Sequence, residues 1–468
     1  MDKFIDIAYL VSAIFFIYGL KMLSHPKTAR NGNIIASLGM LIAIIVTVYI
    51  GTDLDFTKII IAMIVGSIIG AFFAVRVQMT QMPQLVAIFN GFGGGASALV
   101  ASSEFLKFSE YQVGSTQSPT FLIISIVLSI LVGTLTFTGS FIAFGKLQGL
   151  VTTKPVTFKG QQLLNGLLAI IMTVAAFMIP VYGIHSFYII VGLSALLGIL
   201  LVIPIGGADM PVVISLLNSY SGIAAAMTGF VLVQNNPSAG IALIICGSLV
   251  GASGMILTQI MCKGMNRSLV NVVFGAVGGE VKDDLSSEKK INIKSYSTEE
   301  AAMIFDAAEK IIIVPGYGLA VAQAQHAVRE LADFLESSGK KVFYAIHPVA
   351  GRMPGHMNVL LAEANIPYEL LKDLDEINPE FKDCDVALVL GANDVVNPAA
   401  RTEKNSPIYG MPILNVDESR TVIINKRTMN TGFAGVQNEL FGYDNSIMVF
   451  GDAKDMLVKL LSDLKELG

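Results

Sequence analysis

The sequence predicts an α-helical membrane domain of about nine transmembrane helices, followed by a soluble α/β doubly wound, Rossmann-like domain. Of the 468 residues, 53% are hydrophobic and only 14% are charged, whereas soluble proteins carry about 25% charged residues. The longest apolar runs all lie before residue 265. From about residue 290, short apolar runs alternate with amphipathic segments, which is typical of a doubly wound sheet.

Nine apolar stretches are candidate spans, because about 20 apolar residues cross a bilayer as a helix. They cover approximately residues 4–22, 33–50, 59–75, 85–101, 120–144, 163–181, 187–205, 212–233 and 239–262. The fourth stretch is short and rich in glycine. Spans two to nine, bounded in this way, contain no Asp, Glu, Lys, Arg or His.

The basic residues between the spans predict the orientation, since loops rich in Lys and Arg stay in the cytoplasm. One set of loops holds nine of them and the other holds three, Lys3, Lys58 and Lys107. With an odd number of spans, the N-terminus is expected outside and everything after residue 265 in the cytoplasm. We therefore predict a transmembrane domain over 1–265, a linker over 266–290 and a cytoplasmic domain over 291–468.

Several function classes are disfavoured by composition. A net charge of −5 and the lack of a basic, aromatic-rich patch argue against nucleic acid as a partner. The three cysteines, Cys246, Cys262 and Cys384, form no CxxC or Cys/His spacing. Neither a disulfide framework nor a metal site is expected.

A glycine turn in the soluble domain predicts a dinucleotide site. The strand-like run IIIV leads into Gly316, Tyr317 and Gly318, followed by a stretch that favours a helix. Gly316 would allow the tight turn, and Gly318 would let the backbone and a helix N-terminus approach a pyrophosphate. A structural turn is the alternative. Val321 stands where Gly or Ala is usual and is expected to hold the helix further from the sheet.

The residues around the next strands favour NADP(H) over NAD(H). The second strand, KKVFYAIHP, carries no carboxylate for ribose hydroxyls. Lys426 and Arg427 follow the strand TVIIN and could bind a 2′-phosphate. A solvated basic pair is the alternative from spacing alone. Asn393 and Asp394, in GAND after the strand VALVL, are candidate ligand contacts or simply turn residues.

Several long motifs resemble one family over nearly the whole chain, the beta subunits of bacterial proton-translocating NAD(P) transhydrogenases. The stretches that carry the resemblance are MTQMPQLVA at 79, TFTGSFIAFGKL at 136, GGADMPVVISLLNSYSG at 206, MCKGMNRS at 261, PGYGLAVAQAQ at 315, HPVAGRMPGHMNVLLAEA at 347, GANDVVNPAA at 391, GMPIL at 410 and KRTMNTGFAGVQN at 426. The resemblance implies an NADP(H)-binding domain in the cytoplasm, attached to a multi-pass domain in the bacterial inner membrane.

The resemblance also implies the nucleotide contacts and the partners. NADP(H) would bind among Gly316, Tyr317, Gly318, Val321, Ala350, Gly351, Arg352, Gly391, Ala392, Asn393, Asp394, Lys426, Arg427, Gly432 and Phe433. NAD(H) would bind to an alpha subunit that brings further transmembrane helices, in a dimer of heteromers. Because hydride would pass directly between the nicotinamides, no catalytic residue is expected.

Protons would have to cross a domain that is poor in charge. The neutral polar residues Asn90, Ser140 and Asn218 are the candidate path, although such residues also simply bond neighbouring helices. Some family members carry a histidine at the position of Asn90, and an amide does not titrate near neutral pH. A titrating group is therefore expected from the partner. By family position, Asp209 and Arg267 could form a gating salt bridge, or a static surface pair.

A second function remains open on the sequence alone. The chain could be a transporter or channel that NADP(H) gates without redox chemistry. Such a protein would need no second nucleotide-binding partner.

Overall fold

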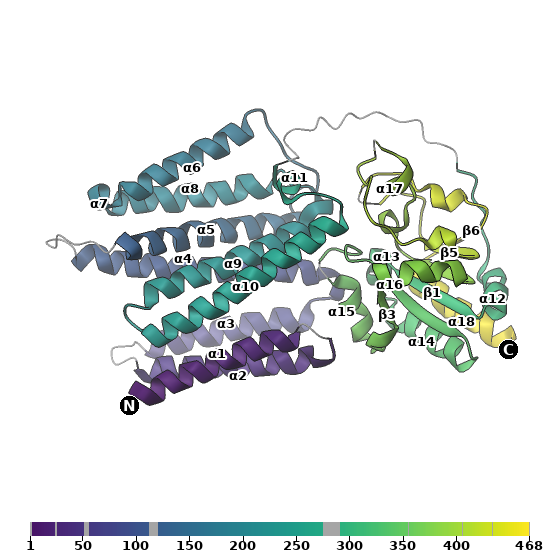
Figure 1. The fold of residues 1–468 in the computed structure, drawn as a ribbon, viewed down its shortest axis with the longest axis horizontal. Coiled ribbons are helices and arrows are strands. Elements are labelled where there is room, and N and C mark those ends of the chain that lie inside the picture. The colour runs from purple at the N-terminus through teal and green to yellow at the C-terminus, as the bar shows by residue number, and fades with distance from the viewer. Residues whose placement is uncertain are drawn as a thin grey trace. The chain divides into compact units, whose positions relative to one another are not determined.

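The computed structural model describes residues 2–23, 26–50, 56–111, 120–274, 291–353, 355–404, 406–432 and 434–467. The chain divides into two compact units (Figure 1). One comprises Met1–Thr258 with Val270–Gly278, and the other comprises Gln259–Leu269 with Gly279–Gly468. The predicted linker lies partly outside the described residues, at 275–290, so the domain boundaries at 265 and 290 stay predictions.

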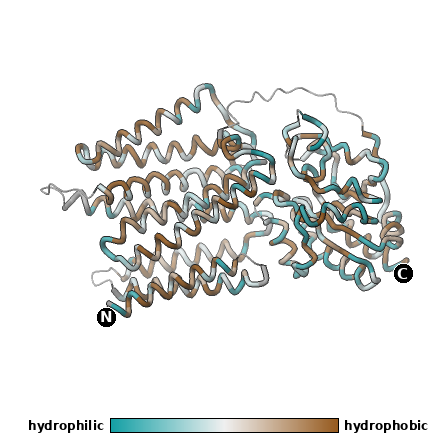
Figure 2. Tube along the Cα trace, in the orientation of Figure 1, coloured by the Kyte–Doolittle hydropathy of each residue, from teal (hydrophilic) through white to brown (hydrophobic). Residues whose placement is uncertain are grey.

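The first unit is helical. Its α-helices are α1 (Asp2–Leu23), α2 (Pro26–Ile50), α3 (Phe56–Arg76), α4 (Met82–Tyr111), α5 (Thr120–Gln148), α6 (Gln161–Phe177), α7 (Ile179–Tyr182), α8 (Ile184–Val202), α9 (Met210–Leu232), α10 (Pro237–Gly264) and α11 (Leu269–Phe274), with short 3-10 turns η1 (Met79–Gln81) and η2 (Gly207–Asp209). The end of α10, from Gln259, and the first residue of α11 are assigned to the second unit. Eight of the described helices are long and apolar enough to cross a membrane. Figure 2 shows their apolar character along most of their length.

The sixth predicted span, over residues 163–181, is shorter than expected. It corresponds to α6, an apolar helix of 17 residues that ends at Phe177 rather than near residue 181. Pro180 lies just beyond, and a proline lacks an N–H and collides with the carbonyl four residues earlier. The chain therefore breaks at Met178, makes the short helix α7 and turns at Gly183, where φ is +49°.

Several helices extend further than the predicted spans. The glycine-rich fourth span becomes α4, of 30 residues, which continues past Glu104 and Lys107. Helix α5 likewise includes Lys146 in its last turn. The charged residues absent from the predicted spans thus lie in the end sections of the longer helices, away from the bilayer centre, where a charge is most costly.

The centre of the helical unit is formed by α4, α5, α8 and α9, with α5 packed against the other three. Glycines allow close approach. A Cβ at Gly94 of α4 would lie 2.8 Å from the Gly133 carbonyl oxygen of α5. On α9, a Cβ at Gly222 would lie 2.7 Å from the Gly247 carbonyl oxygen of α10. Without a hydrophobic driving force between helices, such contacts contribute van der Waals attraction.

The second unit contains a six-stranded parallel sheet. Its strands are β1 (Lys310–Pro315), β2 (Lys341–Ile346), β3 (Leu371–Asp373), β4 (Val386–Leu390), β5 (Thr421–Lys426) and β6 (Ser446–Phe450). Their order is β3-β2-β1-β4-β5-β6, the order of a dinucleotide-binding doubly wound fold. The order reverses between β1 and β4, which places a ligand crevice at the carboxyl ends of these two strands.

Helices and short turns connect and flank the strands of this sheet. They are α12 (Thr298–Ala307), α13 (Tyr317–Val321), α14 (Gln325–Ser337), α15 (His356–Glu363), α16 (Leu374–Ile377), α17 (Ala399–Thr402) and α18 (Ala453–Leu467), with 3-10 turns η4 (Tyr368–Leu370), η5 (Asn378–Asp383), η6 (Asp394–Val396), η7 (Val416–Glu418) and η8 (Glu439–Gly442). Alternate strand residues such as Ile312 and Val389 pack with Phe381 on one face. Strands that are buried on both faces of a sheet have continuous apolar sequences, as β1 and β4 do.

Two local features differ from the sequence prediction. Strand β3 has only three residues, too few to show a pattern. The amphipathic stretch after the glycine turn was expected to form one helix, but α13 ends at Val321 and α14 begins at Gln325. Gln323 lies between them with φ +48°, a left-handed conformation that interrupts a right-handed helix.

Candidate functional site

The carboxyl ends of β1 and β4 touch through three glycines. Gly316 N donates to Leu390 O over 2.8 Å, and Gly318 N donates to Gly391 O over 2.9 Å. A Cβ at Gly318 would lie 2.6 Å from Gly391 Cα. Gly391 itself has φ +64°, which favours glycine because it has no Cβ. The two turns therefore form one compact backbone platform.

This platform differs from the predicted phosphate cradle. The amides of Gly316 and Gly318 are bonded to the β4 turn, so they are not free donors for a pyrophosphate. Helix α13 has only five residues. Val321 ends α13 and its side chain is 40% exposed, so its expected effect on the distance between helix and sheet stays a prediction.

The loop after β2 folds against the platform. The guanidinium of Arg352 lies over the Tyr317 ring, 4.3 Å from its centroid, which is a cation–π contact. Arg352 N donates to His356 Nδ1 over 3.0 Å. Gly351 has φ +108°, and a Cβ there would lie 2.7 Å from His356 Nδ1. Ala350 is buried beside them. Burial raises the pKa of Tyr317, although Arg352 opposes this shift.

The turn after β4 holds the predicted pair Asn393 and Asp394, next to the buried Ala392. Asp394 Oδ2 accepts a bond of 3.0 Å from Ala434 N, and a Cβ at Gly432 would lie 2.7 Å from Asp394 Cγ. Asp394 thus contacts both Gly432 and Ala434. Asn393 Nδ2 is buried and has no hydrogen-bond partner among the described residues. Because buried donors are normally bonded, this amide is a candidate donor to a ligand.

A pocket of about 140 Å³ adjoins Asn393. Its lining comprises Asn393, Met429, Asn430, Thr431, Gln437, Asn438 and Phe441. Lys426, at the end of β5, donates to Asn430 O over 2.8 Å and lies 4.7 Å above the Phe441 ring. Burial lowers the pKa of Lys426 to about 8, with nearby Asp394 opposing. Arg427 is exposed beside it. A donor, a cation and an aromatic ring therefore meet at the carboxyl edge of the sheet.

Most predicted nucleotide residues lie at this edge, and some site residues were missed. Phe433 lies outside the described residues. Asn438 was not predicted, although its Nδ2 donates to Asn393 O over 3.0 Å. Phe441 and Asn430 were missed too. The polar run that follows TVIIN could have indicated these residues. Its position beside Asn393 depends on the fold and is not visible in the sequence.

The two histidines of the loop after β2 have structural roles. His347 is 2% exposed. Its Nε2 bonds Pro412 O over 2.7 Å, and its Nδ1 accepts from Val349 N over 3.2 Å. These partners require a neutral ring with the proton on Nε2. His356 begins α15, and its Nδ1 accepts from Arg352 N.

We expect His347 to make this domain sensitive to acid. Burial lowers the pKa of His347 to about 4 from 6.5. Because the folded-state pKa lies below the unfolded one, its stabilisation is complete above pH 6.5 and is lost as the pH falls towards 4. The stabilising free energy lost in this way is about 3 kcal/mol. The measurement is the change with pH in the free energy of opening of β1 and β2, from amide hydrogen exchange of the full chain in detergent.

The variant His347→Gln keeps an N–H for Pro412 but cannot titrate, so its opening energy should change less between pH 7 and pH 4, by about 3 kcal/mol. His326→Gln is the control, since His326 is exposed on α14. The same acid sensitivity in His347→Gln as in the natural chain would show that His347 does not cause it.

The predicted polar residues of the helical unit lie on three helices that pack together. Asn90 of α4 is buried and donates to Ile214 O of α9 over 3.2 Å. Ser140 of α5 is fully buried, and its hydroxyl has no hydrogen-bond partner among the described residues. Asn218, one turn beyond Ile214 on α9, is half-buried. The interpretation that Ser140 simply bonds a neighbouring helix finds no support here.

Asp209 and Arg267 lie at the ends of helices. Asp209 is buried at the end of η2, directly before α9. Arg267 is half-buried after α10, and its N donates to Cys262 O over 2.9 Å. The two residues fall in different units, so their salt bridge stays a prediction.

Comparison with known proteins agrees with these features. The profile of the NAD(P) transhydrogenase beta subunit family matches residues 5–463. Two relatives, both named NAD(P) transhydrogenase subunit beta and both from Rhodospirillum rubrum, are 51% identical over 458 residues, which cover 97% of this chain and 97% of theirs. Apolar spanning helices, a parallel sheet of dinucleotide-binding order and a match over nearly the whole length lead to one assignment. The chain belongs to the NAD(P) transhydrogenase beta subunit family.

Proposed function

We propose that this chain binds NADP(H) on its C-terminal domain, exchanges hydride with NAD(H) on an alpha subunit, and couples that exchange to proton movement through its helical domain. The observation that carries the nucleotide half is the buried Asn393 Nδ2, which has no partner among the described residues and adjoins the pocket beside Lys426. The family supports the coupling, since its relatives are named transhydrogenase subunits.

The residues present fit NADP(H). Asn393 offers a buried donor and Phe441 offers an aromatic surface. Lys426 and Arg427 offer a point charge and a planar fork, which suit a 2′-phosphate. NADPH supplies the hydride when it is bound. The residues of this chain bind and orient, so the reaction requires no acid, base or metal from them.

Arg352 and Tyr317 complete the proposed site from the other side of the platform. The Arg352 guanidinium, whose Cζ lies 4.3 Å from the centroid of the Tyr317 ring, is a cation near the turn after β1. A phosphate group would find there a charge whose position is already fixed.

The proposed proton path lies among α4, α5 and α9. Asn90, Ser140 and Asn218 supply amides and a hydroxyl that can hold water but cannot store a proton near neutral pH. The titrating group therefore comes from a transmembrane helix of the alpha subunit. The unpartnered, buried hydroxyl of Ser140 supports a water at this level.

Asp209 and Arg267 form the proposed gate on the cytoplasmic side. Their salt bridge would open and close with the nucleotide state of the C-terminal domain. The complex lies in the bacterial inner membrane as a dimer of heteromers, with the N-terminus outside. The excess of Lys and Arg in one set of loops supports that orientation.

The test uses sealed vesicles that contain this chain with or without an NAD-binding alpha subunit. NADPH oxidation by an NAD analogue and the internal pH are followed together. We expect both signals only with the partner. In Arg267→Gln, the protons moved per hydride should fall about tenfold, because the charge-assisted contact of the gate is lost. Hydride transfer without the partner, or no pH change with it, would contradict the proposal.

A further inference from the structure

The helical unit contains a buried cation that the proposed proton path does not use. Lys146, in the last turn of α5, is 0% exposed. Among the residues that the structure describes, no other lysine or arginine is buried to this degree. Burial of an ammonium group is costly unless all its donors are bonded. Its surroundings must therefore stabilise it.

Three backbone carbonyl oxygens supply that stabilisation. Lys146 Nζ donates to Ile203 O over 2.5 Å, to Ile205 O over 2.8 Å and to Lys154 O over 3.3 Å. An ammonium group has three protons, so every donor is used. Ile203 caps the C-terminus of α8, where the helix dipole favours a positive charge. No carboxylate is needed to hold Lys146, and none among the described residues pairs with it.

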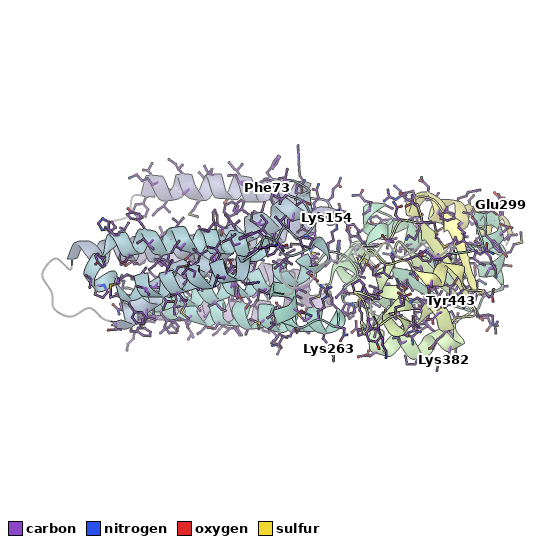
Figure 3. All side chains as sticks on the ribbon, turned by 90° about the horizontal axis from the view of Figure 1, so that it is seen from above. Phe73, Lys154, Lys263, Glu299, Lys382 and Tyr443 are labelled. Carbon is purple, nitrogen blue, oxygen red and sulfur yellow. The ribbon has the colours of Figure 1, made fainter. Side chains whose placement is uncertain are left out.

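The acceptors belong to two connections that lie together. Lys154 lies in the connection between α5 and α6, at one end of the helical unit (Figure 3). Ile203 and Ile205 belong to the connection between α8 and α9. Val156 N also donates to Ile203 O over 3.3 Å, and Gly207 N donates to Thr153 O over 2.9 Å. We call these two connections, over 149–160 and 203–206, the clasp.

A second buried side chain reinforces the clasp. Gln161 is 0% exposed, and its Nε2 donates to Leu200 O over 3.0 Å in the last turn of α8. Its Oε1 accepts from Phe158 N over 3.4 Å. Two polar side chains from outside α8 thus satisfy carbonyls at its end, which would otherwise lack partners.

The clasp leads directly to Asp209. Ile205 lies four residues before it, and Gly207, which is bonded to Thr153, begins the turn η2 that Asp209 ends. We propose that Lys146 is a positioning residue for the gate: its ammonium group fixes the backbone between α8 and α9 and so holds Asp209 in place. This inference rests on the proposed function, because Asp209 is one half of the proposed gate.

The test compares Lys146→Met, which keeps the length but removes the donors, with Lys146→Arg, which keeps them. Amide hydrogen exchange of the segment 203–209 is measured on the full complex in detergent. We expect about tenfold faster exchange in Lys146→Met, because charge-assisted hydrogen bonds are lost, and recovery of most of the protection in Lys146→Arg. Lys159→Met is the control, since Lys159 is exposed in the same connection.

Coupling is measured on the same variants in vesicles. Lys146→Met should move about threefold fewer protons per hydride, yet hydride exchange between NADH and an NAD analogue through retained NADP(H) should stay within about twofold. A merely structural role would lower both reactions together, with the amount of folded complex. Full coupling in Lys146→Met, or unchanged exchange at 203–209, would overturn this inference alone. Absence of coupling in the natural complex would instead overturn the proposed function.

Discussion

Gly391→Ala should destabilise the C-terminal domain by about 3 kcal/mol or more and weaken NADP(H) binding about 100-fold or more. Alanine at φ +64° is strained by about 1–2 kcal/mol. In addition, its Cβ would lie 2.7 Å from the carbonyl carbon of Gly318 and 2.8 Å from its nitrogen. These are backbone atoms that cannot rotate away, so the turns after β1 and β4 must separate.

Gly339→Ala is the matched control. Gly339 has φ +83°, but nothing lies within 4 Å of an added Cβ. It should therefore cost about 1–2 kcal/mol through backbone strain alone, with NADP(H) affinity within about twofold of the natural chain. Stability is read from hydrogen exchange of β1 and β4, and affinity from calorimetry with NADPH. Equal behaviour of the two variants would show that close contact of the two turns is not needed.

Arg427→Gln should weaken NADPH binding about 100-fold and leave NADH binding nearly unchanged. A bidentate contact between guanidinium and phosphate involves two charge-assisted hydrogen bonds of about 1.5 kcal/mol each. NADH has no 2′-phosphate and would not lose them. Both affinities are measured by calorimetry on the full chain in detergent. The ratio of the two affinities is the decisive quantity, because misfolding would lower both.

Arg420→Gln is the control for Arg427. Arg420 stands just before β5, at the opposite end of the strand from Arg427, and its Nη1 pairs with Asp385 Oδ1 over 3.0 Å. Its side chain is 81% exposed, and such surface pairs contribute about 0–1 kcal/mol. It should bind both nucleotides as the natural chain does. An equal loss for NADPH and NADH in Arg427→Gln would mean that Arg427 does not contact the 2′-phosphate.

The sequence predicted the two-part architecture because both patterns are local. Apolar runs of about 20 residues mark spans by composition, and five of the six strands follow apolar runs. The helix of the sixth predicted span ends at Phe177, before Pro180, and not near residue 181, since composition does not show where a helix breaks. Likewise β3 and the break at Gln323 depend on tertiary contacts rather than on local periodicity.

The site residues were predictable only where a motif directly follows a strand, because the strand then determines where the motif lies. The glycine turn and GAND follow strands whose carboxyl ends must lie together in a parallel sheet. The pair formed by Asn393 and Asn438 spans 45 residues of sequence, and nothing local indicates it. Lys146 gave no signal of burial either, because its acceptors Ile203 and Ile205 lie 57 and 59 residues further along the chain.

The glycine contacts between α9 and α10 have a mechanical consequence. Gly229 approaches Gly240, and Gly222 approaches Gly247, so closely that a single added Cβ would meet backbone atoms of the other helix. Ser219 also donates to Gly251 O over 2.7 Å. Two helices in such contact cannot slide or tilt against each other without losing it at several levels. We therefore expect α9 and α10 to behave as one rigid body.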